Sequence, residues 1–193
     1  DWANSAFMLT VITTIFPVYF VSVLVGGQME EDAAQQRFAE TTRNALIVIA
    51  FLAPLLGTIA DFRAAKKLLL AFFAGLGVVA TAFMFFLYPG DWRLALWLFG
   101  IANVGAAGSV IFYDALLPHV AKEGEMDRLS TAGYALGYLG SGFLLILNLL
   151  WVNKPEWFGF PSGEGLTDAQ KTFPVRLSFL SVAVWWAVFT LPI

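Results

Sequence analysis

Long uncharged stretches constrain this chain more than any other feature, because six of them follow one another within 193 residues. Charged residues gather between the stretches and leave each one almost purely apolar. A helix needs about 20 such residues to cross the hydrocarbon core of a bilayer, and stretches of roughly 17–25 residues are able to do so. The stretches are Trp2–Met29, Asn44–Ala60, Leu68–Gly90, Leu94–Tyr113, Leu129–Asn153 and Leu177–Ile193.

These stretches are too long for the strands of a membrane β-barrel, which take about 9–11 residues and alternate in polarity. Inside a bilayer every backbone N–H and C=O must find its partner within the protein, so a non-barrel span must be a helix. We therefore predict an all-α membrane protein in the lipid bilayer, with a single six-helix bundle over residues 1–193. The expected transmembrane helices cover residues 5–25, 44–60, 68–88, 94–117, 132–152 and 175–192.

The composition agrees with a lipid environment, since 59% of the residues are hydrophobic and only 13% are charged. Soluble domains carry about 25% charged residues. The net charge of −3 gives no reason to expect a nucleic-acid partner. Without cysteine, and with a single histidine, the chain offers no metal site, and we expect no cofactor.

Basic residues give a weak indication of orientation. Arg63, Lys66 and Lys67 crowd into one short connector, and the positive-inside rule favours the cytoplasm for that side. Because the sequence opens at Asp1 rather than Met, we also expect it to be part of a longer protein.

Polar side chains on the first predicted helix lie on one side. At 100° per residue, Thr10, Thr13, Thr14 and Pro17 fall within about one third of the circumference. One interpretation is a substrate cavity lined by Thr10 and Thr14, beside a bend at Pro17. The alternative is that the threonines bond to their own backbone next to a packing kink.

The fourth predicted helix carries Asn103 and Asp114 three turns apart, with small residues between them. Polar groups at membrane depth usually face protein or water, so Asn103 is a candidate substrate contact and Asp114 a candidate for gating or ion coupling. The alternative places Asp114 at the membrane surface, paired with a nearby Lys or Arg.

The fifth predicted helix is the most informative, because Tyr134, Tyr138 and Ser141 share a side that also includes Asn148. The neighbouring side carries Gly133 and Gly137, whose spacing lets another helix approach closely. We expect the polar side to line a solute cavity, with hydrogen bonds between helices as the alternative. By contrast, the third and sixth helices are rich in Phe and Trp and are expected to be outer helices.

The second connector resembles a loop signature of the major facilitator superfamily. Gly57 is followed four residues later by Asp61 and then by the basic pair Lys66 and Lys67, although Phe62 stands where an arginine usually follows the aspartate. The resemblance implies that Asp61, Lys66 and Lys67 take part in gating. The alternative is that Asp61 and the lysines only mark the membrane boundary.

Four further segments resemble the vacuole-effluxer-like branch of that superfamily, and together they extend the resemblance over nearly the whole chain. They are Asp1–Phe7, Phe112–Pro118, Gly133–Gly140 and Arg176–Phe179 with Trp185 and Trp186. The resemblance implies a twelve-helix transporter of two halves, of which this chain is the N-terminal half and lacks its C-terminal partner. Fungal members of the branch export amino acids from the vacuole, whereas its bacterial members are poorly defined.

We therefore expect an alternating-access transporter of a small polar solute, with amino acid efflux as one form of it. The bacterial cytoplasmic membrane is the expected location and the vacuolar membrane the alternative. A non-transporting membrane scaffold or subunit is the second functional hypothesis. An enzyme is not expected, because the spans contain no paired carboxylates, no Ser–His pair and no phosphate-binding loop.

Overall fold

The computed structural model describes residues 2–63, 65–120 and 126–191, with the side chains of residues 59–63, 117–120 and 126 left undescribed. The described part is helical and contains six helices long and apolar enough to cross a membrane, which confirms the predicted fold class. The first span, Asn4–Leu24, consists of α1 (Asn4–Ala6), η1 (Phe7–Ile15), α2 (Phe16–Tyr19) and η2 (Phe20–Leu24). The others are α3 (Glu31–Arg63), α4 (Lys66–Phe83) with the 3-10 turn η3 (Met84–Phe86), α5 (Trp92–Val120), α6 (Met126–Asn153) and α7 (Asp168–Thr190), the last preceded by the 3-10 turn η4 (Pro155–Phe158).

The first span departs from regular α-helix on both sides of Pro17. The segments η1 and η2 are π-helical, with the proline in the short α-helical piece α2 between them. Proline has no N–H to give to the preceding turn, and wide turns inside a helix are one way to absorb that loss. The hydrogen-bond pattern is therefore irregular on both sides of Pro17, and the bend itself stays a prediction.

Two helices begin well before the expected residues. The second helix begins at Glu31 rather than near residue 44, because Glu31 and Asp32 favour a helix start and side-chain pairs such as Gln36–Glu40 support the polar turns. The sixth begins at Asp168 rather than near residue 175. There Thr167 and Gln170 form a capping box that pairs the first free backbone groups of the helix.

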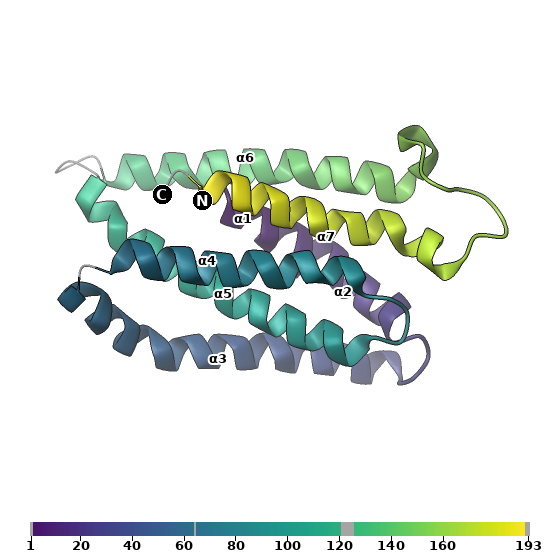
Figure 1. Cartoon of the computed structure of the whole chain (residues 1–193), viewed down its shortest axis with the longest axis horizontal. Coiled ribbons are helices and arrows are strands. Elements are labelled where there is room, and N and C mark those ends of the chain that lie inside the picture. Colours follow the sequence, from purple (N-terminus) through teal and green to yellow (C-terminus); the bar gives the residue numbers. More distant parts are fainter. Residues whose placement is uncertain (1, 64, 121–125, 192–193) are drawn as a thin grey trace.

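Helix contacts follow an internal repeat. The second and fourth spans pack together (α3 with α5), and so do the fifth and first (α6 with α1 and η1). The third span contacts the fourth (α4 with α5), as the sixth contacts the first (α7 with η1), and α4 also contacts α7. Exchanging the first three spans with the last three thus leaves the contact pattern unchanged. Figure 1 shows α3 and α6 at opposite edges of the bundle, with α4, α5 and α7 between them.

Aromatic rings join four spans at the centre of the bundle. Phe16 stacks on Phe99 with ring centroids 4.6 Å apart, and Phe38 lies 4.8 Å from Phe99. Phe179 of the sixth span meets Phe16 edge-on at 5.9 Å. Aromatic pairs in such geometries add to the packing energy beyond the area that they bury. This cluster fixes the first, second, fourth and sixth spans relative to one another.

Glycines bring α4 and α5 into close contact. A Cβ placed on Gly105 would lie 2.7 Å from the Cα of Gly77 and 2.8 Å from the carbonyl oxygen of Phe73, and one on Gly108 would collide with the ring of Phe73. In lipid, helices associate mainly through van der Waals contact, which small residues maximise. Gly140 of the fifth helix likewise packs against the indole of Trp2.

Arg176 ties the start of α7 to the end of the third span. The guanidinium is 4% exposed and donates to the carbonyl oxygens of Phe85, at 3.0 Å, and Ala169, at 2.9 Å. It also lies 4.2 Å from the ring centre of Tyr88. A cation near the carbonyl end of a helix is favourable, because that end carries partial negative charge.

The expectation of outer third and sixth helices is only partly met within this bundle. In the most apolar 18-residue stretch of α7, 44% of the residues are buried, since Phe179, Val182 and Trp186 pack into the core. The second span is the least covered, at 11%, and the fifth reaches only 33%. The aromatic residues of the sixth helix thus reflect helix packing as well as lipid contact. The two least covered helices, α3 and α6, offer the largest surface to further partners.

We predict that Gly105→Ala destabilises the protein by about 1–3 kcal/mol, because the added methyl group would have to push α4 and α5 apart. Gly75→Ala on α4 is the matched control, since no neighbouring side chain or helix lies within 4 Å of the place that its added methyl group would take. Thermal unfolding of the purified full-length protein in detergent measures both variants. Equal melting temperatures for the two would contradict the close helix contact.

Candidate functional site

The threonines of the first span differ in what they contact. Thr13 and Thr14 both donate to the carbonyl oxygen of Leu9 at 2.7 Å, and Thr14 can reach five residues back because the turn is π-helical. Thr10 is fully buried and has no hydrogen-bond partner within the described structure. Thr13 and Thr14 therefore make the hydrogen bonds to their own backbone that the alternative interpretation predicts. A solute contact for Thr10 and Thr14 stays a prediction.

Asn103 and Asp114 share a strip of α5 but have different surroundings. Asn103 is buried and its amide donates to the carbonyl oxygen of Phe99 at 2.9 Å, one turn back along the helix. Asp114 is exposed near the end of the fourth span. Ser109, on the same helix, donates a 3.3 Å hydrogen bond to the side-chain oxygen of Asn4 on the first span. The sequence analysis did not predict this contact. Ser109 and Asn4 are polar residues inside long apolar stretches, and that pattern could have identified them from the sequence.

The polar side of α6 is divided between the bundle and its surface. Ser141 and Asn148 are fully buried, and Asn148 accepts a hydrogen bond from Ser181 of α7 at 2.9 Å. Tyr134 and Tyr138 point outward, with 45% and 64% of their surface exposed. Ser141 donates to the carbonyl oxygen of Tyr138 at 3.2 Å. We call Tyr134 and Tyr138 the tyrosine pair; they are the predicted cavity residues that remain open to a partner or a solute.

The candidate gating residues lie at the turn between α3 and α4. Lys66 and Lys67 form the first turn of α4, so the basic pair opens the third span. Asp61 belongs to the last turns of α3, and its side chain lies outside the described part of the chain. A gating role for Asp61, Lys66 and Lys67 therefore stays a prediction.

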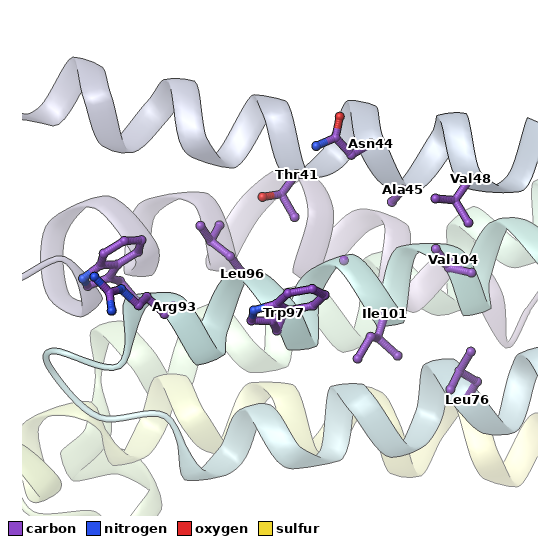
Figure 2. A pocket seen from close by; sticks show the side chains of 12 residues that line it. Thr41, Asn44, Ala45, Val48, Leu76, Arg93, Leu96, Trp97, Ile101 and Val104 are labelled. Carbon is purple, nitrogen blue, oxygen red and sulfur yellow. The ribbon is translucent and has the colours of Figure 1, made fainter.

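A groove of about 640 Å³ lies between α3 and α5, and Figure 2 shows its lining from close by. We call it the lateral groove. It contains none of the predicted site residues, and its lining comes from three helices. The residues are Thr41, Asn44, Ala45 and Val48 on α3, Leu76 on α4, and Trp92, Arg93, Leu96, Trp97, Gly100, Ile101 and Val104 on α5.

Among the described residues, no three His, Asp or Glu side chains come together in a way that would hold a metal ion. The candidate residues and the lateral groove instead offer single hydroxyls, amides and charges, among them the tyrosine pair, Asp114 and Arg93. Such groups bind solutes or lipids by hydrogen bonds and charge.

A bundle of six spanning helices, built from two related sets of three, defines a class of protein. It is the architecture of one half of a major-facilitator transporter, in which repeats of three helices are nested within each half. The described chain is thus an integral, multi-pass membrane protein of this fold class.

Comparison with known proteins identifies the family within this class. The chain belongs to the vacuole effluxer Atg22-like family, which it matches over residues 45–126 and 120–193. It is also 32% identical over 192 residues to the uncharacterized MFS-type transporter YxiO of Bacillus subtilis (strain 168). That alignment covers 100% of this chain and 43% of the relative, so the chain spans less than half of the relative's length. No solved structure matches the chain.

We predict that a cysteine at Tyr138 in the full-length protein reacts with a membrane-impermeant thiol reagent, because this side of α6 would face an aqueous path. Leu139→Cys is the control, since Leu139 is similarly exposed at 70% but lies 100° further around the helix. The chain itself has no cysteine to interfere, and other cysteines of the full-length protein would be replaced. Equal protection of both positions would show that the tyrosine pair faces lipid or packed protein.

Proposed function

We propose that the full-length protein is a secondary transporter of a small polar metabolite, with amino acids as the first class to test, and that this chain is its N-terminal half. The tyrosine pair carries the proposal. Tyr138 lies about 17 Å along α6 from Asp127, well inside a hydrocarbon core of about 30 Å. A phenol at that depth has no hydrogen-bond partner in lipid tails, so it favours protein or water.

The family supports transport between two halves. The curated relative is named a transporter, and the chain is shorter than half of it, which leaves length for a second six-helix half. Solute binding near the midplane between two halves, with access alternating by rocking, is the general mechanism of such architectures. In this proposal the second half covers the tyrosine pair, and the solute binds between them.

The charges of the described spans favour a solute without a large net charge. Asp114 is the one acidic candidate of the predicted cavity, and the tyrosine pair offers neutral hydroxyls. A zwitterionic amino acid could pair its ammonium group with Asp114 and its carboxylate with hydroxyl donors. Asp61 with Lys66 and Lys67 would hold one access state closed, so that breaking this set shifts the population of the two states.

A membrane scaffold remains the second candidate because of one specific observation. Four polar side chains of the candidate region, Thr13, Thr14, Asn103 and Ser141, donate to backbone carbonyls of their own helices. Such bonds satisfy the side chains without any solute or aqueous path. A scaffold would need the six spans but not an accessible tyrosine pair.

Counterflow of labelled amino acids into proteoliposomes containing the full-length protein separates the two candidates. We expect counterflow with at least one amino acid, and a loss of about three- to tenfold with Tyr138→Phe, the worth of one hydrogen bond. Tyr88→Phe is the matched control, because it removes a phenol that lies outside the candidate region and keeps the ring beside Arg176.

Asp114→Asn and Asp61→Asn test the coupling and gating roles in the same assay, and each should lower counterflow while leaving the melting temperature unchanged. If no amino acid or other small metabolite exchanges, and none of these variants differs from the unmodified protein, the scaffold is the better account.

A further inference from the structure

The lateral groove has two chemically different ends. Near the start of α5 it is lined by Trp92, Arg93 and Trp97, with Thr41 and Asn44 opposite on α3. Farther along α5 its walls are Val48, Leu76, Ile101 and Val104, as Figure 2 shows. Tryptophan and arginine are the side chains that membrane proteins place at the headgroup level. The groove is therefore polar and aromatic at one end and purely aliphatic at the other.

The length of the groove matches one leaflet of a bilayer. Trp92 and Arg93 form the beginning of the fourth span, so they lie at the membrane surface. From Arg93 to Val104 the helix rises about 17 Å, close to half of the roughly 30 Å hydrocarbon core. An acyl chain with its headgroup at Arg93 would reach the end of the groove near the bilayer midplane.

The charge at the surface end is available to an anion. Arg93 is exposed, its guanidinium lies 5.0 Å from the ring centre of Trp92, and no carboxylate partner holds it within the described structure. Asp91, just before α5, and Glu40, on α3, have hydrogen bonds of their own. Asp91 accepts from the backbone N–H of Tyr88 at 3.0 Å, and Glu40 accepts from Gln36 at 2.9 Å. A guanidinium binds phosphate through two parallel hydrogen bonds.

The groove opens beside a surface that suits lipid better than a second helical half. Leu76 of α4 forms one of its walls, and beyond Lys67 in the first turn the large exposed side chains of α4 are apolar, among them Leu68, Phe72, Val79 and Phe83. The tyrosine pair, which we assign to the interface with the second half, lies on α6 at the opposite edge of the bundle (Figure 1).

We propose that the lateral groove binds one phospholipid, with its phosphate on Arg93 and one acyl chain along Val48, Leu76, Ile101 and Val104. Trp92 and Trp97 flank the glycerol region, where tryptophan rings lie in membranes. The bound lipid would fill the space between α3 and α5 beside the close approach of Gly100 to Thr41. The site is separate from the solute path of the proposed transporter.

The test uses the full-length protein in nanodiscs of phosphatidylethanolamine and phosphatidylglycerol, with a trace of phosphatidylglycerol carrying a photoactivatable diazirine on one acyl chain. After illumination, peptide mass spectrometry locates the crosslinks. We expect them to concentrate on residues 41–48 and 97–104. Arg93→Gln should lower crosslinking there by at least about threefold, as loss of a charge-assisted bond requires.

Val48→Trp should nearly abolish crosslinking, because the indole would occupy the groove. Two controls lie on the other side of α3, where Arg43→Gln removes a surface cation and Leu46→Trp adds an equal ring. Neither control should change the crosslinks in the groove.

Three results would overturn the proposal. Crosslinks equally dense around Leu46 would indicate ordinary bilayer contact, and equal competition by excess diacylglycerol and phosphatidylglycerol would remove the role of the phosphate. A disulfide formed between Ile101→Cys and a cysteine in the second half would show that protein covers the groove.

Discussion

The absence of water from the hydrocarbon core is the constraint on which the rest of this structure depends. Because lipid tails accept no hydrogen bonds, each spanning backbone pairs its own polar groups, which is why every long apolar stretch becomes a helix. The same constraint acts on hydroxyl side chains. Thr13, Thr81 and Ser22 each donate to a carbonyl oxygen four residues back, at 2.6 to 2.8 Å. Polar residues within these spans are thus not evidence of a cavity by themselves.

Lipid also removes the driving force that would bury apolar faces in water, so the bundle is held by close contact and a few polar bonds. Gly77 and Gly105 let two backbones touch, and Trp151 and Asn148 bond to serines of α7. The helix contacts as a whole join all six spans and leave α3 and α6 least covered.

The sequence predicts the spans well because their signal is local: a long uncharged run has one stable form in a bilayer. It misplaces the starts of the second and sixth helices because Glu31 and Thr167 stabilise helix ends in polar segments, outside the hydrophobic pattern. It groups Tyr138 with Ser141 by angle, although only the serine is buried in the bundle. The lateral groove escapes prediction altogether, since its lining comes from three helices, α3, α4 and α5, whose packing the hydrophobic pattern does not specify.

The central claim is that the tyrosine pair faces a second half and water, whereas the lipid-facing surface lies elsewhere. A cryo-electron microscopy map of the full-length protein in lipid nanodiscs tests it most directly, because acyl chains and protein side chains are both visible around each helix. The account predicts protein from the second half, or a solvent-filled space, opposite Tyr134 and Tyr138, and acyl-chain density against Leu139. Continuous acyl-chain density packed on both tyrosines would contradict it.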